Sequence, residues 1–241
     1  MEVAAGVHLV PGTVGNITLV CAPEVALFDS GLPGDGPAVL AYLSALGIAA
    51  RDLGVIALTH ADPGHAGGAP WLRRQTAARI LAAPAAAAAA AGNPPAGGFR
   101  ALGRTVLGLA GRRPEVFAVD GTIGPGDVVA GFEVVATPGH TPGHLSFFRP
   151  GDGVLVAGDA VRVAGLDILA PPFWDTRSEP LARASIAELA DLPVHLLIPG
   201  HGPPYREPAE QLRRAGGPPG FMAERLARLE ERRQRRAARR R

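Results

Sequence analysis

Residues 55–68 read VIALTHADPGHAGG. The first four are apolar, and the two leading residues are β-branched, which favours a buried strand. The strand is followed at once by His60, Asp62 and His65, three potential metal ligands within six residues. The Pro and Gly residues among them let the backbone turn sharply, so that these side chains can converge on one point. The segment therefore predicts a metal site at the end of a strand.

The same arrangement returns three times further along the chain. His140 follows the run VVATPG, Asp159 follows VLVAG, and His201 follows LLIPG. Each run is strand-like, ends at a Gly and delivers one His or Asp. Cys21 is the only cysteine, which excludes an internal disulfide and a thiolate metal cage. Imidazole and carboxylate ligands without thiolate suit zinc, iron or manganese.

Strand-like segments along the chain are interspersed with helix-like ones. The predicted strands are 17–20, 25–28, 55–58, 134–137, 145–148, 154–157 and 196–198. The predicted helices are 37–46, 69–76, 180–190 and 207–215, several with Pro in the first turn. This mixture predicts a layered α/β fold.

The composition indicates one globular domain. The chain has 241 residues, of which 47% are apolar and 19% charged, and no apolar run is long enough to cross a bilayer. Its first residues lack the pattern of a secretory signal, so we expect a cytoplasmic protein. We place the domain at 1–215. Within it, 84–114 is a predicted insertion that either walls a substrate pocket or forms a low-complexity surface helix.

The predicted tail, 216–241, has a net positive charge, whereas the rest of the chain is net negative. All 24 basic residues are Arg, and 221–241 holds nine of them against three Glu, which leaves 15 Arg against 19 acidic residues elsewhere. An Arg cluster can contact an anionic surface, although a solvated tail without a specific partner is the simpler interpretation. We expect no specific nucleic-acid partner, and the oligomeric state stays open.

Taken together, the motifs resemble the metallo-β-lactamase superfamily. The resemblance rests on 59–68, on TPGHTPGH at 137–144, on Gly158-Asp159, on PGHG at 199–202 and on Asp29-Ser30-Gly31. It implies a four-layer αββα sandwich. It also implies that His60 and His140 hold a first metal, that His65 and His201 hold a second, and that Asp159 bridges the two.

Two positions depart from the His-x-His-x-Asp-His pattern of that superfamily. Asp62 stands where the second His is expected, and it can still ligate. Gly64 stands where the Asp is expected, and it has no side chain to ligate or to orient a water. The first site thus retains His60, Asp62, His140 and a share of Asp159, whereas the second retains only His65, His201 and Asp159. One or two Zn²⁺ per chain is the expectation, with Fe or Mn as alternatives.

The resemblance implies a metal-dependent hydrolase with Asp159 at the centre of its catalytic site. A bound ion supplies a hydroxide nucleophile that attacks a small ester, thioester, lactone or lactam. One alternative is an iron-dependent sulfur dioxygenase-like oxidoreductase. Another is a metal-binding relative without turnover, because Gly64 marks a degenerate site. His144 precedes the run LSF and is predicted to start a strand near the site rather than to ligate.

Overall fold

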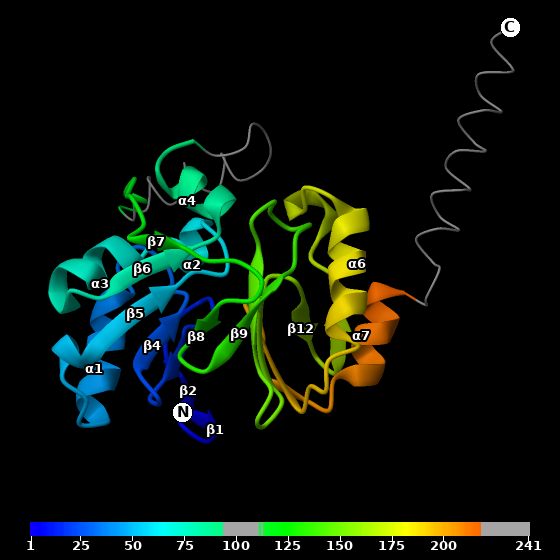
Figure 1. The fold of residues 1–241 in the computed structure, drawn as a ribbon, viewed down its shortest axis with the longest axis horizontal. Coiled ribbons are helices and arrows are strands. Elements are labelled where there is room, and N and C mark those ends of the chain that lie inside the picture. Colours follow the sequence, from blue (N-terminus) through cyan, green and yellow to red (C-terminus); the bar gives the residue numbers. More distant parts are fainter. Residues whose placement is uncertain (94–110, 112, 218–241) are drawn as a thin grey trace, which may run out of the picture.

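Two β-sheets stand face to face in the middle of the molecule, and helices cover the outer face of each. The computed structural model describes residues 1–93, 111 and 113–217. Figure 1 shows α1 (Gly36–Ala45) and α3 (Ala69–Thr76) on one side of the sheets and α6 (Glu179–Leu189) and α7 (Ala209–Gly216) on the other. This arrangement is the predicted four-layer αββα sandwich, which the structure confirms.

The first sheet is built from the N-terminal half of the chain. Within the described residues its seven strands run in chain order, with antiparallel pairs up to β4 and parallel pairs from β4 to β7. The strands are β1 (Glu2–Ala4), β2 (Val7–Leu9), β3 (Thr18–Val20), β4 (Val25–Phe28), β5 (Leu53–Ala57), β6 (Arg79–Ala82) and β7 (Gly121–Thr122).

The second sheet comes from the C-terminal half. Its order in the described part of the chain is β15-β14-β11-β10-β9-β8, and only β11 and β14 pair in parallel. The strands are β8 (Val128–Val129), β9 (Phe132–Ala136), β10 (Leu145–Arg149), β11 (Val154–Gly158), β14 (Leu196–Pro199) and β15 (Tyr205–Arg206). A separate hairpin, β12 (Arg162–Ala164) with β13 (Asp167–Leu169), follows β11.

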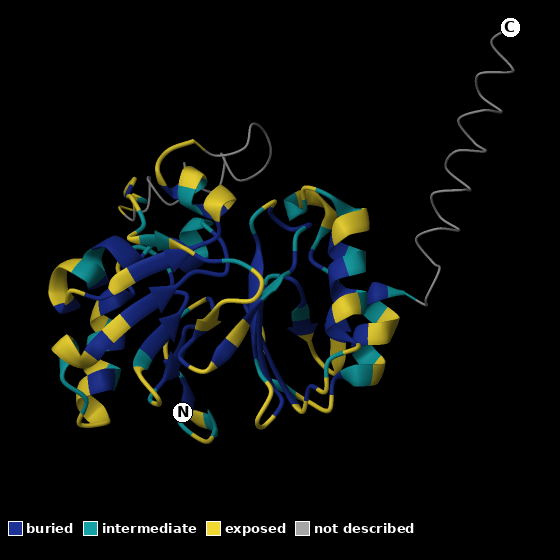
Figure 2. Ribbon diagram, viewed as in Figure 1, coloured by how far each residue is buried: buried dark blue, intermediate teal, exposed yellow. Residues whose placement is uncertain are grey.

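Alternate residues of the central strands fill two different cores. In β11, Val154 and Val156 belong to the core between the sheets, whereas Leu155 and Ala157 belong to the core beneath α6 and α7. Because successive side chains of a strand point to opposite faces, a strand buried on both faces reads as an unbroken apolar run. Figure 2 shows the central strands buried and the helices exposed on their outer surfaces.

Aromatic rings join the two sheets. Phe28 of β4 stacks on Phe147 of β10, with ring centroids 4.4 Å apart, and meets the edge of Phe132 of β9 at 4.9 Å. All three rings are fully buried. Burying a side chain of this size stabilises the fold by about 1.5 to 3 kcal/mol. These ring contacts therefore help to hold the two sheets together.

The remaining elements are short. They comprise α2 (Pro63–Ala66), α4 (Pro84–Ala90) and the 3-10 turns η1 (Ala50–Asp52) and η2 (Phe173–Asp175). Of the predicted insertion 84–114, residues 94–110 and 112 lie outside the described residues, as does the predicted tail from 218 onward. Among the described residues, no helix combines the length and apolar character needed to cross a membrane.

Candidate metal centre

The predicted ligands converge because several strands end at the same edge of the sandwich. His60 follows β5 of the first sheet, while His140, Asp159 and His201 follow β9, β11 and β14 of the second. These three strands of the second sheet run in the same direction, since β9 and β11 are both antiparallel to β10 and β14 is parallel to β11. Side chains beyond the carboxyl ends of strands can meet at such an edge.

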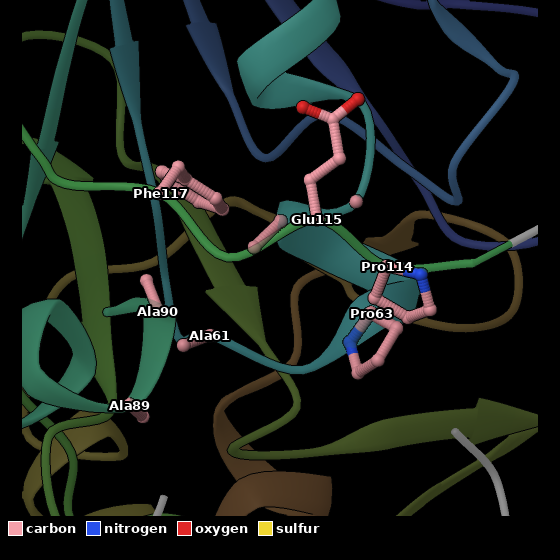
Figure 3. Close-up of a pocket in the computed structure, with 9 residues that line it drawn as sticks. Ala61, Pro63, Ala89, Ala90, Pro114, Glu115 and Phe117 are labelled. Carbon is pink, nitrogen blue, oxygen red and sulfur yellow. The ribbon is translucent and has the colours of Figure 1, made fainter. Parts of the chain in front are cut away.

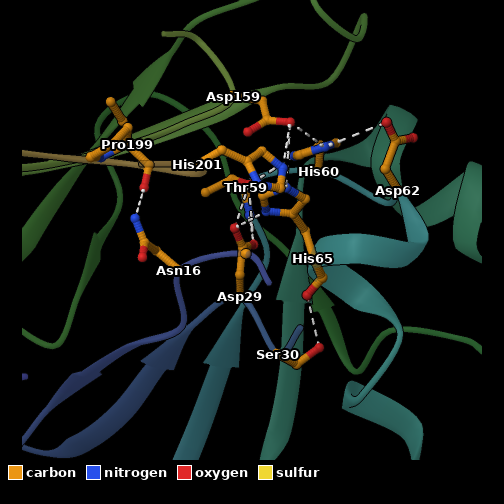
Figure 4. A network of polar contacts seen from close by, with 12 residues as sticks. Asn16, Asp29, Ser30, Thr59, His60, Asp62, His65, Asp159, Pro199 and His201 are labelled. Atoms are coloured by element: carbon orange, nitrogen blue, oxygen red, sulfur yellow. Dashed lines mark hydrogen bonds and ion pairs between the residues drawn. The ribbon is translucent and has the colours of Figure 1, made fainter. Parts of the chain in front are cut away.

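One carboxylate oxygen lies among all four histidines. Oδ2 of Asp159 is 3.4 Å from Nε2 of His65, 3.5 Å from that of His140, 3.7 Å from that of His201 and 3.9 Å from that of His60. Figure 4 shows Asp159 facing His60, His65 and His201. Four histidines from three separate parts of the sequence thus present the same nitrogen to one oxygen.

Asp62 completes a first group with His60 and His140. Its Oδ2 is 3.5 Å from Nε2 of His60 and 3.4 Å from Nε2 of His140. Ligands bound tetrahedrally to zinc at about 2.0 to 2.1 Å stand about 3.3 to 3.4 Å apart. The spacing of this first group therefore fits a single ion, and the same three residues form one of the candidate metal clusters of the described residues.

His65 and His201 form a second group. Their Nε2 atoms are 3.4 Å apart, and each faces Oδ2 of Asp159. The side chain of His65 is only 2% exposed, whereas that of His201 is 46% exposed. Gly64 lies in α2, and a Cβ added there would meet no atom within 4 Å. A side chain at position 64 would therefore begin in open space.

The charges of the cluster favour a cation. Burial would raise the pKa of Asp159, but His65, His60 and His140 hold it well below its usual range, so the carboxyl stays ionised. Burial would lower the pKa of His65, but the carboxylates of Asp159 and Asp29 raise it well above its usual range. For His60, burial and the neighbouring His65 lower the pKa. The centre thus attracts positive charge, and a metal ion would satisfy that attraction without protonating a ligand.

Two buried polar atoms of the site have no hydrogen-bond partner among the described residues. They are Nε2 of His60 and Oδ1 of Asp159. An unsatisfied buried polar atom is costly, and such an atom in a native structure requires an explanation. Both belong to groups that bind zinc, so the residues present fit a metal ion.

His144 is bonded at both ring nitrogens. The N–H of Asp159 donates to its Nε2 (3.0 Å), and its Nδ1 lies 2.8 Å from the hydroxyl of Thr137. Burial, together with the nearby His60 and His140, lowers the pKa of His144 well below its usual range. A neutral ring therefore holds the backbone of Asp159 in place, and no nitrogen of this ring is available to a metal.

Two residues next to strands of the first sheet, Asn16 before β3 and Ser30 after β4, support the ligand loops. The side chain of Asn16 donates to the carbonyls of Pro199 and Gly202 at 2.8 Å each, which holds the loop that carries His201. The hydroxyl of Ser30 donates to the carbonyl of His65 at 2.8 Å. Figure 4 shows both residues beside the site. Sequence motifs did not indicate Asn16, and the Asp29-Ser30-Gly31 motif did not indicate the contact of Ser30, because both contacts join segments far apart in the sequence.

A shallow pocket adjoins the loop that carries His60 and Asp62 (Figure 3). Its lining includes Ala61 of that loop and residues from both described ends of the predicted insertion, namely Ala89, Ala90 and Pro114. Glu115, its charged residue, is bonded to both terminal nitrogens of Arg74 at 2.8 and 2.9 Å. The described parts of the insertion thus wall a pocket; that it receives substrate remains a prediction.

The chain matches a family model over residues 10–201, and the model is that of the metallo-beta-lactamase superfamily. The chain belongs to this superfamily. The match spans every candidate ligand from His60 to His201. The predicted superfamily is thus confirmed.

Several superfamily members of known sequence are similar to this one. It is 33% identical over 196 residues to metallo-beta-lactamase domain-containing protein 1 of Xenopus laevis, which covers 80% of this chain and 72% of that protein. It is 31% identical over 166 residues to a hydroxyacylglutathione hydrolase of Methylobacillus flagellatus, with 69% of this chain covered. The chain spans about half the length of that hydrolase, 54%.

A solved structure shows the same fold. A metallo-beta-lactamase family protein of Thermus thermophilus superposes with a TM-score of 0.68 and 26% identity, and the match covers 95% of this chain and 82% of that one. The superfamily and its hydrolase members support a metal-binding hydrolase in general terms.

Proposed function

We propose that this chain is a zinc-dependent hydrolase of small esters, thioesters or lactones. The observation that carries the proposal is the position of Asp159 Oδ2, which lies within 3.4 to 3.9 Å of four histidine Nε2 atoms. In this proposal His60, Asp62, His140 and Asp159 hold a first ion. His65, His201 and Asp159 hold a second, weaker one. Asp159 bridges the two.

A bound divalent ion lowers the pKa of its water toward neutrality and polarises a substrate carbonyl. The protein side chains make this chemistry possible in two ways. The buried imidazoles of His60, His65 and His140 shield the centre from bulk solvent, which strengthens the electrostatic interactions inside it. The partly exposed His201 and Asp62 lie at the open side, so substrate approaches past these two residues.

The similar proteins and the metal-binding residues indicate which substrates this centre would act on. The similar proteins include hydroxyacylglutathione hydrolases, whose name describes a thioester substrate. A site of this kind needs no nucleophilic Ser or Cys, and a polarised carbonyl is common to esters, thioesters, lactones and lactams. We propose that thioesters and lactones are better substrates than β-lactams.

The test is a substrate panel with zinc-loaded protein. Hydroxyacylglutathione thioesters, acyl homoserine lactones, aryl esters and β-lactams are assayed after removal of metal and after return of zinc. We expect zinc-dependent turnover of a thioester or lactone, and none with His140→Ala. Absence of zinc-dependent hydrolysis across the panel, by protein that holds zinc, would contradict the proposal.

Iron is the second candidate metal, because two histidines with a carboxylate also suit an open iron site. The same protein loaded with ferrous iron is therefore assayed for oxygen uptake with a glutathione persulfide. Oxygen uptake with iron, without hydrolysis with zinc, would assign an oxidative reaction to this centre instead.

A further inference from the structure

A single buried carboxylate contacts a histidine of the second ligand group and the residue that precedes a histidine of the first. Asp29 follows β4, and its side chain is 3% exposed. Its Oδ1 accepts the backbone N–H of Thr59 at 2.8 Å. Its Oδ2 lies 2.8 Å from the hydroxyl of Thr59 and 2.7 Å from Nδ1 of His65. Asp29 thus contacts one proposed ligand, His65, and the residue before another, His60.

Thr59 extends this network to a second ring. Its hydroxyl oxygen is 2.9 Å from Nδ1 of His60, and the residue is completely buried. Asp29, as a carboxylate, has only acceptor atoms, so the single hydroxyl proton of Thr59 is donated to it. The hydroxyl can then only accept from His60, which places the proton of that ring on Nδ1. Figure 4 shows this chain of contacts.

The proton positions decide which nitrogens face the centre. His65 donates its Nδ1 proton to Asp29 directly, and His60 donates its own to Thr59. In both rings Nε2 is then the nitrogen through which a metal would bind, and Nε2 of His60 has no hydrogen-bond partner among the described residues. A ring nitrogen must be unprotonated to bind a metal, and the partner of the other nitrogen sets the tautomer.

We propose that Thr59 is a positioning residue for His60. Asp29 sets the tautomer of the His60 ring through the hydroxyl of Thr59, and it sets the tautomer of the His65 ring by a direct hydrogen bond. The inference rests on the proposed function, because it takes His60 and His65 as metal ligands. One buried acid then orients a ligand of each group, by a direct bond on one side and through a hydroxyl on the other.

The hydroxyl of Thr59 can be removed without changing the shape of the side chain. Val has the same branched outline as Thr and lacks the hydroxyl. This matters because Thr59 packs tightly against Gly158, where an added Cβ would come within 2.8 Å of the Thr59 side chain. Thr59→Val keeps that contact, whereas Thr59→Ser keeps the hydroxyl and loses the methyl group.

The experiment compares Thr59→Val with Thr59→Ser. We expect Thr59→Val to weaken the tighter zinc site about 10- to 100-fold, the usual effect of removing the partner of a ligand, and Thr59→Ser to bind close to wild type. Thr18→Val is the matched control, since Thr18 is also buried but its hydroxyl has no partner among the described residues. Zinc affinity is measured by competition with a chromogenic chelator.

Nitrogen-15 NMR of the histidine rings, with and without zinc, supplies a readout that a change in packing would not produce. We expect the Nδ1 proton of His60 to be lost or exchange rapidly in Thr59→Val, and that of His65 to persist in every variant because its bond to Asp29 is direct. A folded Thr59→Val that binds zinc as wild type does, or a Thr59→Ser equally impaired, would overturn the inference. Wild-type protein that binds no zinc would instead contradict the proposed function, and the ring tautomers of the metal-free protein would still decide the role of Thr59.

Discussion

The two ligand groups share Asp159 but differ in what the sequence supplies around it. The first group has a carboxylate of its own, Asp62, placed 3.4 to 3.5 Å from both of its histidines. The second group has Gly64 where the superfamily pattern has an Asp, and it has a histidine, His201, with nearly half of its side chain exposed. If both groups bind metal as proposed, the first has four candidate ligands and the second has three. We therefore expect the first group to bind its metal more tightly.

The largest effect is expected when the shared carboxylate is removed. Asp159→Ala takes a ligand from both groups and leaves four histidine nitrogens without their common anion. The affinity for both metals should therefore fall more than about 100-fold, which exceeds the usual effect of removing a hydrogen-bond partner of a ligand. Elemental analysis after dialysis measures the bound metal. Asp152→Ala, which removes an aspartate from a surface pair with Arg149, is the control. Unchanged metal content in Asp159→Ala would show that the two groups do not share this ligand.

The next effect separates the two groups. His140→Ala should abolish tight binding at the first group, because it removes one of two histidines from the four-ligand set. His201→Ala should remove the second metal and leave the first, since His201 contacts only His65 and Asp159 within the site. Both losses should be at least about tenfold. Calorimetric titration with zinc counts the sites in each variant. Loss of both metals in His201→Ala would show one coupled centre instead.

Gly64 offers a way to equalise the groups. Gly64→Asp should tighten the second site by about tenfold or more, because an added anionic ligand offsets the charge of the ion. Gly64 lies in a helix and its φ is not in the positive range that favours glycine. A Cβ there meets open space, so the variant should fold. Gly64→Ala, which adds the Cβ alone, is the control. Two tightly held metals in the unmodified protein, by elemental analysis after exhaustive dialysis, would show that Gly64 is no deficit.

The smallest effect concerns pH. The pKa of His65 is raised, so a proton competes with metal at the second group at a higher pH than at the first, where the pKa of His60 is lowered. As pH falls from about 8 to about 5, the second metal should leave first. Zinc release is followed with a fluorescent indicator that is insensitive to pH over this range. Release of both metals at the same pH would show that the two groups do not differ in their competition with protons.

The amino-acid sequence determined the central elements and the candidate ligands because both depend on local patterns. Strands such as β11 are buried on both faces, so they appear as continuous apolar runs, and the Gly at the end of each run places a His or Asp just beyond it. The predicted strands and helices agree with the structure to within two residues at their ends. Short strands such as β7 and β15 were missed, since two residues carry no period and their pairing comes from neighbouring strands.

Only the tertiary structure decided how the ligands are held. The bonds from Asp29 to His65 and Thr59 span 36 and 30 residues, and those from Asn16 to the His201 loop span more than 180. No local pattern encodes such contacts, because they form only when β4 and β5 lie side by side and the two sheets meet at one edge. Local sequence thus indicates the groups that can bind a metal, whereas packing sets their distances, their hydrogen-bond partners and their exposure.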